Sequence, residues 1–199
     1  MGSNQLTAGG LTYPTSDGTT GQYLQTDGAG ALSFQTVSTS NVSTDTEQAS
    51  TSGTFIDFSS NIPANVKRIT ILLDDVSTNG TSDLLIQIGD SGGIETTGYD
   101  SFSTYLFQTG SGKTSYTTGY GSDWGSTAGE RKGAITLNNM SGNKWICTAV
   151  HTGKDGVNEG TIQMAGSKTL SGTLTQVRIT TVNGTDTFDA GTINLMYEV

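Results

Sequence analysis

The sequence predicts an all-β protein: an N-terminal segment that carries one β-hairpin, followed by a jelly-roll-like antiparallel β-sandwich. Short runs of alternating apolar and polar residues recur along the chain, and glycine, asparagine and aspartate separate them. No segment sustains a helical period. The two prolines, Pro14 and Pro63, lie outside every expected strand, as ladder hydrogen bonding requires.

Nearly all aliphatic clusters lie in residues 51–199, which we expect to form the sandwich. Alternation is clearest where Leu84, Ile86 and Ile88 share one face, and where Val177 and Ile179 do so. Many short strands with closely spaced turn signals are typical of a sandwich or jelly roll. The expected strands are Thr54–Phe58, Arg68–Val76, Leu84–Ile88, Ser103–Gln108, Ala134–Asn138, Trp145–His151, Thr161–Met164, Leu174–Val182 and Ile193–Val199. Asn79-Gly80 and Asn183-Gly184 are typical of hairpins or slightly longer loops between such strands.

Residues 1–50 form the other predicted domain, and their main feature is a hairpin within residues 22–35. Its flanks alternate, and Asp27-Gly28 supplies a turn with positive φ. Only Leu24, Leu32 and Phe34 offer apolar side chains, and an isolated two-stranded hairpin is marginal in water. We therefore expect the same hairpin from sister chains to pack around a common axis. Residues 43–50 are polar and are predicted to be a linker or one helical turn.

Composition excludes several classes of function. The chain carries 9 Lys and Arg against 18 Asp and Glu, so its net charge is −9 and it has no basic stripe for nucleic acid or for an anionic membrane surface. No apolar run is long enough to span a membrane, and the N-terminus lacks the basic and apolar parts of a secretory signal. The single cysteine, Cys147, excludes an internal disulfide and is expected to be a small buried residue.

Residues 11–34 read LTYPTSDGTTGQYLQTDGAGALSF. This stretch resembles the short shaft repeat of bacteriophage tail fibres and tailspikes, because its turn positions and apolar positions agree together. Residues 66–71, 76–82 and 86–99, together with the ending AGTINLMYEV, residues 190–199, resemble C-terminal domains of fibre proteins from phages of marine and freshwater bacteria. The resemblance covers about half the chain.

The resemblance implies a homotrimeric appendage on the tail or capsid of a virion, made in the host cytoplasm. It implies that the N-terminal segment attaches to another virion protein and that the C-terminal domain contacts a host surface polysaccharide or protein. It carries no catalytic residue. Fibres of this family have longer shafts, so a complete short fibre and a part of a longer one both stay open.

Candidate catalytic and metal-binding residues are few. His151 is the only histidine and has no nucleophile motif nearby, so we expect no catalysis from it. A polysaccharide-degrading spike would need two carboxylates across one groove, whereas adjacent residues of a regular strand, such as Asp74 and Asp75, point to opposite faces. The same pair with Asp83 and Asp90 is the candidate for calcium, but the spacing does not match an EF-hand loop. We expect neither an enzyme nor a bound cofactor.

Segment 99–124 is the predicted binding region, because aromatic rings stand there among Gly, Ser and Thr. Rings stack on sugar faces, and carboxylates accept hydrogen bonds from sugar hydroxyls. The candidate glycan-binding residues are Tyr99, Tyr116, Tyr120, Asp123 and Trp124. The alternative assigns Phe102, Tyr105 and Phe107 to the core, and Tyr116, Tyr120 and Trp124 to contacts between subunits.

The sequence therefore predicts a receptor-binding virion fibre. The alternative is a head fibre or decoration protein with a purely structural role, and the second alternative is a polysaccharide-degrading spike. Because many bacterial polysaccharides are anionic, the negative charge of the chain gives no long-range attraction to them. Recognition would then depend on stacking and hydrogen bonds.

Overall fold

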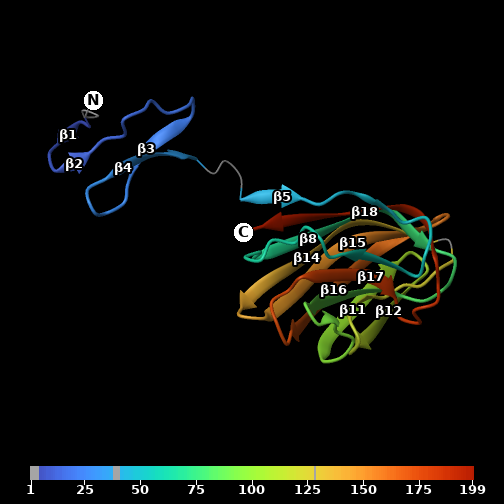
Figure 1. The fold of residues 1–199 in the computed structure, drawn as a ribbon. Coiled ribbons are helices and arrows are strands. Elements are labelled where there is room, and N and C mark those ends of the chain that lie inside the picture. The colour runs from blue at the N-terminus through green and yellow to red at the C-terminus, as the bar shows by residue number, and fades with distance from the viewer. Residues whose placement is uncertain (1–4, 38–40, 128) are drawn as a thin grey trace. The chain divides into compact units, whose positions relative to one another are not determined.

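The computed structural model describes residues 5–37, 41–127 and 129–199 (Figure 1). These residues form strands and turns but no helix, so the predicted all-β class is confirmed. None of them forms a helix able to cross a membrane. The chain divides into two compact units between Asn41 and Val42.

The N-terminal unit contains the predicted hairpin. Strand β3 (Gln22–Thr26) pairs antiparallel with β4 (Leu32–Thr36), which places Leu24 opposite Phe34. Asp27 shapes the turn, because its Oδ1 accepts hydrogen bonds from the N–H groups of Ala29 at 2.8 Å and Ala31 at 2.9 Å. Gly28 has the positive φ, 79°, that the turn requires. A second short pair joins β1 (Thr7–Ala8) to β2 (Leu11–Thr12).

This unit has no core of its own within residues 5–37, because none of these residues is buried. Leu24 is 43% exposed, while Leu32 and Phe34 are only half-buried. The ring of Phe34 lies over Gly18, where an added Cβ would come within 2.7 Å of it. The hairpin therefore leaves part of its apolar surface open to water.

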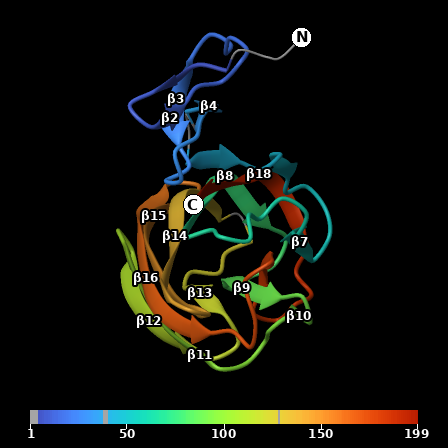
Figure 2. The same ribbon diagram turned by 60° about the vertical axis from the view of Figure 1, so that its left-hand side comes forward.

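The C-terminal unit consists of two antiparallel sheets (Figure 2). The five-stranded sheet has the order β10 (Gly93–Ile94), β9 (Leu84–Asp90), β17 (Gln176–Thr181) and β7 (Phe55–Phe58), with β13 (Tyr120–Ser122) also beside β9. The nine-stranded sheet has the order β12 (Gly110–Tyr116), β11 (Tyr99–Phe107), β16 (Asn158–Thr169), β15 (Lys144–Asp155), β14 (Glu130–Ser141), β8 (Arg68–Thr78) and β18 (Phe188–Glu198), followed by β5 (Val42–Thr44) and β6 (Gln48–Ala49) against β18. The larger sheet curves around the smaller one, and each of the nine predicted strands is present.

The core lies between the two sheets, where period-two alternation directs the apolar side chains. The predicted faces of Leu84, Ile86 and Ile88, and of Val177 and Ile179, are fully buried, which confirms them. The larger sheet contributes facing side chains from β8, β14 and β18. Cys147 is buried and free, as expected from its apolar neighbours.

The predicted domain boundary is wrong by several residues. Residues 42–49 carry β5 and β6, which pair with β18, so they belong to the C-terminal unit and are neither a linker nor a helical turn. The N–H groups of Asp45 and Ser50 donate to the carbonyls of Leu195 and Gly191 at 2.8 and 2.9 Å. A polar sequence can form an edge strand because the ladder needs only backbone groups.

The two Asn-Gly turns do not close hairpins either. Asn79-Gly80 connects β8 to β9 and Asn183-Gly184 connects β17 to β18, and each connection passes from one sheet to the other. Asp186 joins the two turns, because its Oδ2 accepts from the Ser82 N–H at 2.9 Å and its Oδ1 accepts from Asn183 Nδ2 at 2.6 Å. Both crossings therefore lie at one end of the sandwich.

Candidate functional site

The candidate glycan-binding tyrosines point into the sandwich and not toward solvent. Tyr99, Tyr116 and Tyr120 are 4%, 6% and 0% exposed. Their hydroxyls are used internally: Tyr116 donates to Asp83 Oδ2 at 2.8 Å, and Tyr120 donates to the Trp145 carbonyl at 3.2 Å. Burial also raises the pKa of each phenol well above its ordinary value. These rings present no face to a sugar, so the expected binding platform is not built from them.

The other two candidates are also enclosed. Asp123 is 7% exposed, and Trp124 is half-buried with its ring stacked on Phe107 at a centroid distance of 4.2 Å. The sequence prediction treated residues 110–129 as an adaptable loop, whereas β12 pairs along its whole length with β11. Strand pairing turns alternate rings inward. The alternative interpretation placed Phe102 and Phe107 in the core. Phe107 is buried as that interpretation expects, but Phe102 is 45% exposed.

A buried polar cluster surrounds Arg131, which is only 1% exposed. Its Nη2 donates to the Trp124 carbonyl at 2.7 Å and its Nη1 donates to the Gly129 carbonyl at 3.3 Å. Burial lowers the pKa of the guanidinium to about 10, and the charge of Asp83 opposes that shift. Burial and the charge of Asp83 raise the pKa of Asp123. The cluster holds the 123–129 segment through buried charges and has no open approach.

Ser122 and His151 form a hydrogen-bonded pair inside the same region. Ser122 Oγ lies 3.0 Å from His151 Nε2, and His151 Nδ1 lies 3.3 Å from the Thr152 carbonyl. Because a carbonyl only accepts, Nδ1 carries the proton and Nε2 accepts from the serine. This is the hydrogen-bond order of a serine nucleophile and its base. However, the two residues are 0% and 3% exposed, so a substrate has no route to the hydroxyl.

We predict that His151 makes stability fall in mild acid. Burial lowers its pKa to about 4, below the value of about 6.5 for an unfolded chain. The unfolded state therefore binds the proton first, and stability present above about pH 6.5 is lost as pH falls toward 4, by about 3 kcal/mol in all. Urea unfolding near pH 7.5 and near pH 5 should show a larger loss for the wild type than for His151→Gln. An equal loss in both proteins would contradict this assignment.

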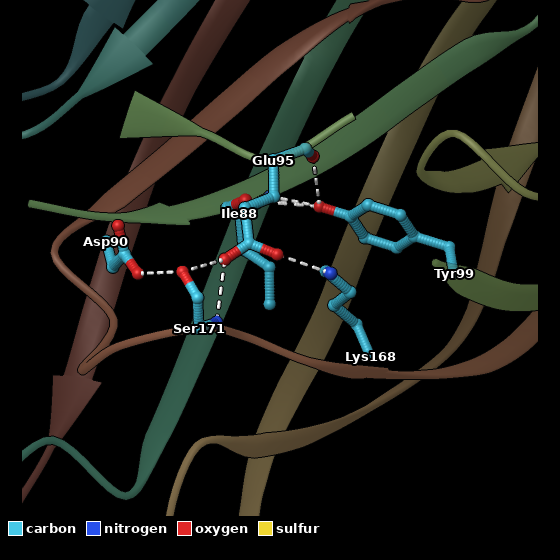
Figure 3. A network of polar contacts seen from close by, with 6 residues as sticks. All are labelled: Ile88, Asp90, Glu95, Tyr99, Lys168 and Ser171. Atoms are coloured by element: carbon cyan, nitrogen blue, oxygen red, sulfur yellow. Dashed lines mark hydrogen bonds and ion pairs between the residues drawn. The ribbon is translucent and has the colours of Figure 1, made fainter. Parts of the chain in front are cut away.

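Figure 3 shows a second polar network at the β9–β10 turn. Lys168, which is 6% exposed, forms an ion pair with Glu95 and lies 5.4 Å from the centre of the Tyr99 ring. Ser171 Oγ lies 2.6 Å from Asp90 Oδ2 and 2.9 Å from Glu95 Oε1. The hydroxyl of Tyr99 donates to the Glu95 carbonyl at 3.0 Å. The network ties this turn to the segment that follows β16.

Asp90 and Glu95 both lie within hydrogen-bonding distance of Ser171 Oγ, but their electrostatics are opposite to what the acid of a glycosidase needs. A glycosidase acid keeps its proton through a raised pKa. The hydroxyl of Ser171 and the N–H of Gly92 lower the pKa of Asp90. Burial alone would raise the pKa of Glu95, but hydrogen bonds from Lys168 and Ser171 outweigh it and lower that pKa as well. Neither carboxyl is arranged to give up a proton near neutral pH.

The remaining acidic candidates are held by basic or hydroxyl partners. Strand β8 is not regular at Asp74-Asp75, because bulges in its pairing with β14 and β18 interrupt it. Lys132 Nζ therefore reaches both carboxylates, at 3.8 Å from Asp74 and 2.8 Å from Asp75. The expectation of opposite faces assumed a regular strand. Among the described residues, no group of three or more His, Cys, Asp or Glu side chains is placed to hold a metal ion.

An open pocket of about 390 Å3 lies on the outer face of the five-stranded sheet. Phe55 lines it and is 50% exposed. The Arg178 guanidinium lies over this ring, with its carbon 4.1 Å from the ring centre. Asp57 holds the guanidinium in a bidentate ion pair, with Arg178 Nε and Nη2 each 2.7 Å from a carboxylate oxygen. We call this the Phe55 pocket.

Polar side chains and turn residues complete the Phe55 pocket. Gln87 lies on β9, with its Nε2 donating to the Thr118 carbonyl at 2.9 Å. Thr180 lies on β17 and donates its hydroxyl hydrogen to the Thr54 carbonyl at 2.8 Å. Asn183 lies at the rim in the β17–β18 turn. The pocket thus combines one open aromatic face, a fixed guanidinium, an amide and hydroxyls.

Our sequence prediction missed this pocket, although a signal for it is present. Ile56 and Phe58 alternate toward the core, so Phe55 and Asp57 fall on the solvent face of the same strand. Arg178 likewise stands between two buried aliphatic residues of β17. An aromatic ring on the solvent face of a strand is a better candidate for ligand contact than a ring in a Gly-rich stretch.

Comparisons of the chain with protein-family models, with curated proteins and with solved structures found no match.

Proposed function

We propose that this chain is a bacteriophage virion fibre protein whose N-terminal unit associates as a trimer and whose C-terminal unit binds the host surface. Residues 11–34, which resemble a fibre shaft repeat, include β3 and most of β4, the hairpin that alternation and the Asp27-Gly28 turn predict. In this proposal the first residues attach to another virion protein. The jelly-roll-like topology of the C-terminal sandwich remains a prediction.

One observation carries the proposal of self-association: the hairpin unit is folded but buries no side chain within residues 5–37. Two-stranded hairpins need a further apolar surface to be stable in water. Leu24, Leu32 and Phe34 supply that surface on one short unit. Association of three copies around an axis removes these side chains from water.

Self-association is tested by the mass of the chain in solution. Sedimentation equilibrium should give three times the chain mass of 20.6 kDa. Leu24→Asp should reduce the mass to that of the single chain, because it places a charge on the surface that the copies share. Gln25→Asp adds the same charge at the next position of β3 and should remain trimeric. A monomeric wild type would refute the trimer, and a trimeric Leu24→Asp variant would refute the hairpin as the surface that the copies share.

A structural fibre without receptor binding is the second candidate, and the burial of Tyr99, Tyr116 and Tyr120 favours it. Two measurements separate the candidates. Purified chain that binds host cells and competes with adsorption of the intact particle supports receptor binding. A density map of the particle that shows residues 1–20 docked across capsid subunits, with no competition in adsorption, supports the structural role.

A further inference from the structure

We infer that the Phe55 pocket is a carbohydrate site for a neutral hexopyranose, either free or at the end of a glycan chain. This inference rests on the proposed host-surface function and names the ligand class and the residues that bind it. Its volume of about 390 Å3 lies in the lower part of the range of small-molecule sites, about 300–1,000 Å3. A site of this size holds one or two sugar rings.

The ring of Phe55 provides the stacking surface. Its side chain is half-exposed and lines the pocket, and the Arg178 guanidinium lies over the ring, 4.1 Å from its centre. The axial C–H groups on one side of a pyranose carry slight positive charge and are attracted to the negative face of an aromatic ring. Arg178 is fixed by Asp57 and in turn limits the ring to one position, so binding does not have to order these side chains.

Hydroxyl groups of the sugar find both donors and acceptors in the pocket. Arg178 Nη1 has no hydrogen-bond partner in the part of the chain that the structure describes, because Nε and Nη2 hold Asp57. Gln87 lines the pocket but is only 7% exposed; among the described residues its side chain bonds through the amide nitrogen, which leaves Oε1 as an acceptor at the pocket wall. The Thr180 oxygen has donated its hydrogen and can still accept. This mixture suits hydroxyls, which both donate and accept.

Charge selects a neutral sugar over an acidic one. The positive charge of Arg178 is already balanced by Asp57, so the pocket has no unpaired cation to attract a carboxylate or sulfate. The whole chain carries −9 and repels anions at long range. A neutral pyranose needs no unpaired cation and is not repelled by the net negative charge, so neither effect weakens its binding.

The inference is tested with the full chain and a fixed panel of probes. Saturation-transfer NMR and titration would use the methyl glycosides of glucose, galactose and mannose, with glucuronate and N-acetylneuraminate as acidic probes. At least one neutral glycoside should bind and both acids should not. Phe55→Ala should weaken binding by about tenfold or more through loss of stacking. Gln87→Leu, which keeps the side-chain volume, should weaken it through loss of the amide oxygen.

Phe102→Ala is the matched control, because Phe102 is 45% exposed on the outer face of the other sheet. It should bind the probe as the wild type does, and thermal melting would verify that all variants fold. Failure of every neutral glycoside, preference for an acid, or unchanged binding by Phe55→Ala would each overturn the inference. If Phe55→Ala chain still blocks phage adsorption, the pocket is wrong and the host-surface function stands; if wild-type chain blocks nothing, the function itself fails.

Discussion

Arg131→Ala is expected to lower the free energy of unfolding by about 3–5 kcal/mol, the usual cost of breaking a buried charged group from its partners. The side chain is the largest fully buried one in the described structure. Removing it leaves the carbonyls of Trp124 and Gly129 without their donor and Asp83 without the nearby positive charge. It also leaves a cavity beneath the Trp124 ring, which lies 5.9 Å from the guanidinium carbon.

Urea denaturation followed by tryptophan fluorescence measures this loss. Arg68→Ala is the control, because Arg68 is likewise a bonded arginine, paired with Glu198, but its side chain is 46% exposed. Exposed pairs contribute about 0–1 kcal/mol, so the control should change stability little. If the two substitutions lower the free energy of unfolding equally, the buried contacts of Arg131 contribute no more to stability than an exposed ion pair does.

Gly191→Ala is expected to destabilise the C-terminal unit by about 3 kcal/mol or more, from two separate causes. Gly191 has a φ of +93°, a region that side-chain-bearing residues rarely adopt. In addition, a Cβ at this position would lie 2.5 Å from the backbone oxygens of Asp74 and Asp75. The close atoms belong to the backbone of β8, which bulges there and where Asp75 already has a φ of 51°, so relief of the contact requires a backbone shift.

Gly184→Ala separates the two causes. Gly184 has a φ of +67°, but an added Cβ would meet no atom within 4 Å. Its replacement should cost only the conformational part, about 1–2 kcal/mol. A shift in thermal melting that is similar for both variants would mean that β8 relaxes around the new methyl group, against our expectation.

The bulges of β8 near Asp74-Asp75 also affect the curvature of the larger sheet. Bulges strengthen local twist and bend a strand. Here β8, β14 and β18 all change register near Asp74-Asp75, and Lys132 pairs with both carboxylates at that point. The nine-stranded sheet curves around the smaller one (Figure 2). The Phe55 pocket is lined by residues of β7, β9 and β17 in the smaller sheet.

The sequence by itself determined the nine expected strands of the C-terminal unit and the N-terminal hairpin, because alternation and turn residues are local properties. It identified the faces of Leu84, Ile86 and Ile88 and of Val177 and Ile179, and the turn at Asp27-Gly28. It also indicated that the N-terminal hairpin has too few apolar side chains for a core, which the exposure of Leu24 agrees with.

Only the tertiary structure decided which aromatic rings meet solvent. Alternation divides a strand into two faces, but the packing of one sheet on the other decides which face is inside. Tyr120 was a candidate glycan-binding residue and is fully buried, whereas Phe55, which was no candidate, is half-exposed beside Arg178. The polar residues 42–49 join the sheet for a related reason, since the unpaired backbone of β18 accepts a neighbour whatever its side chains are.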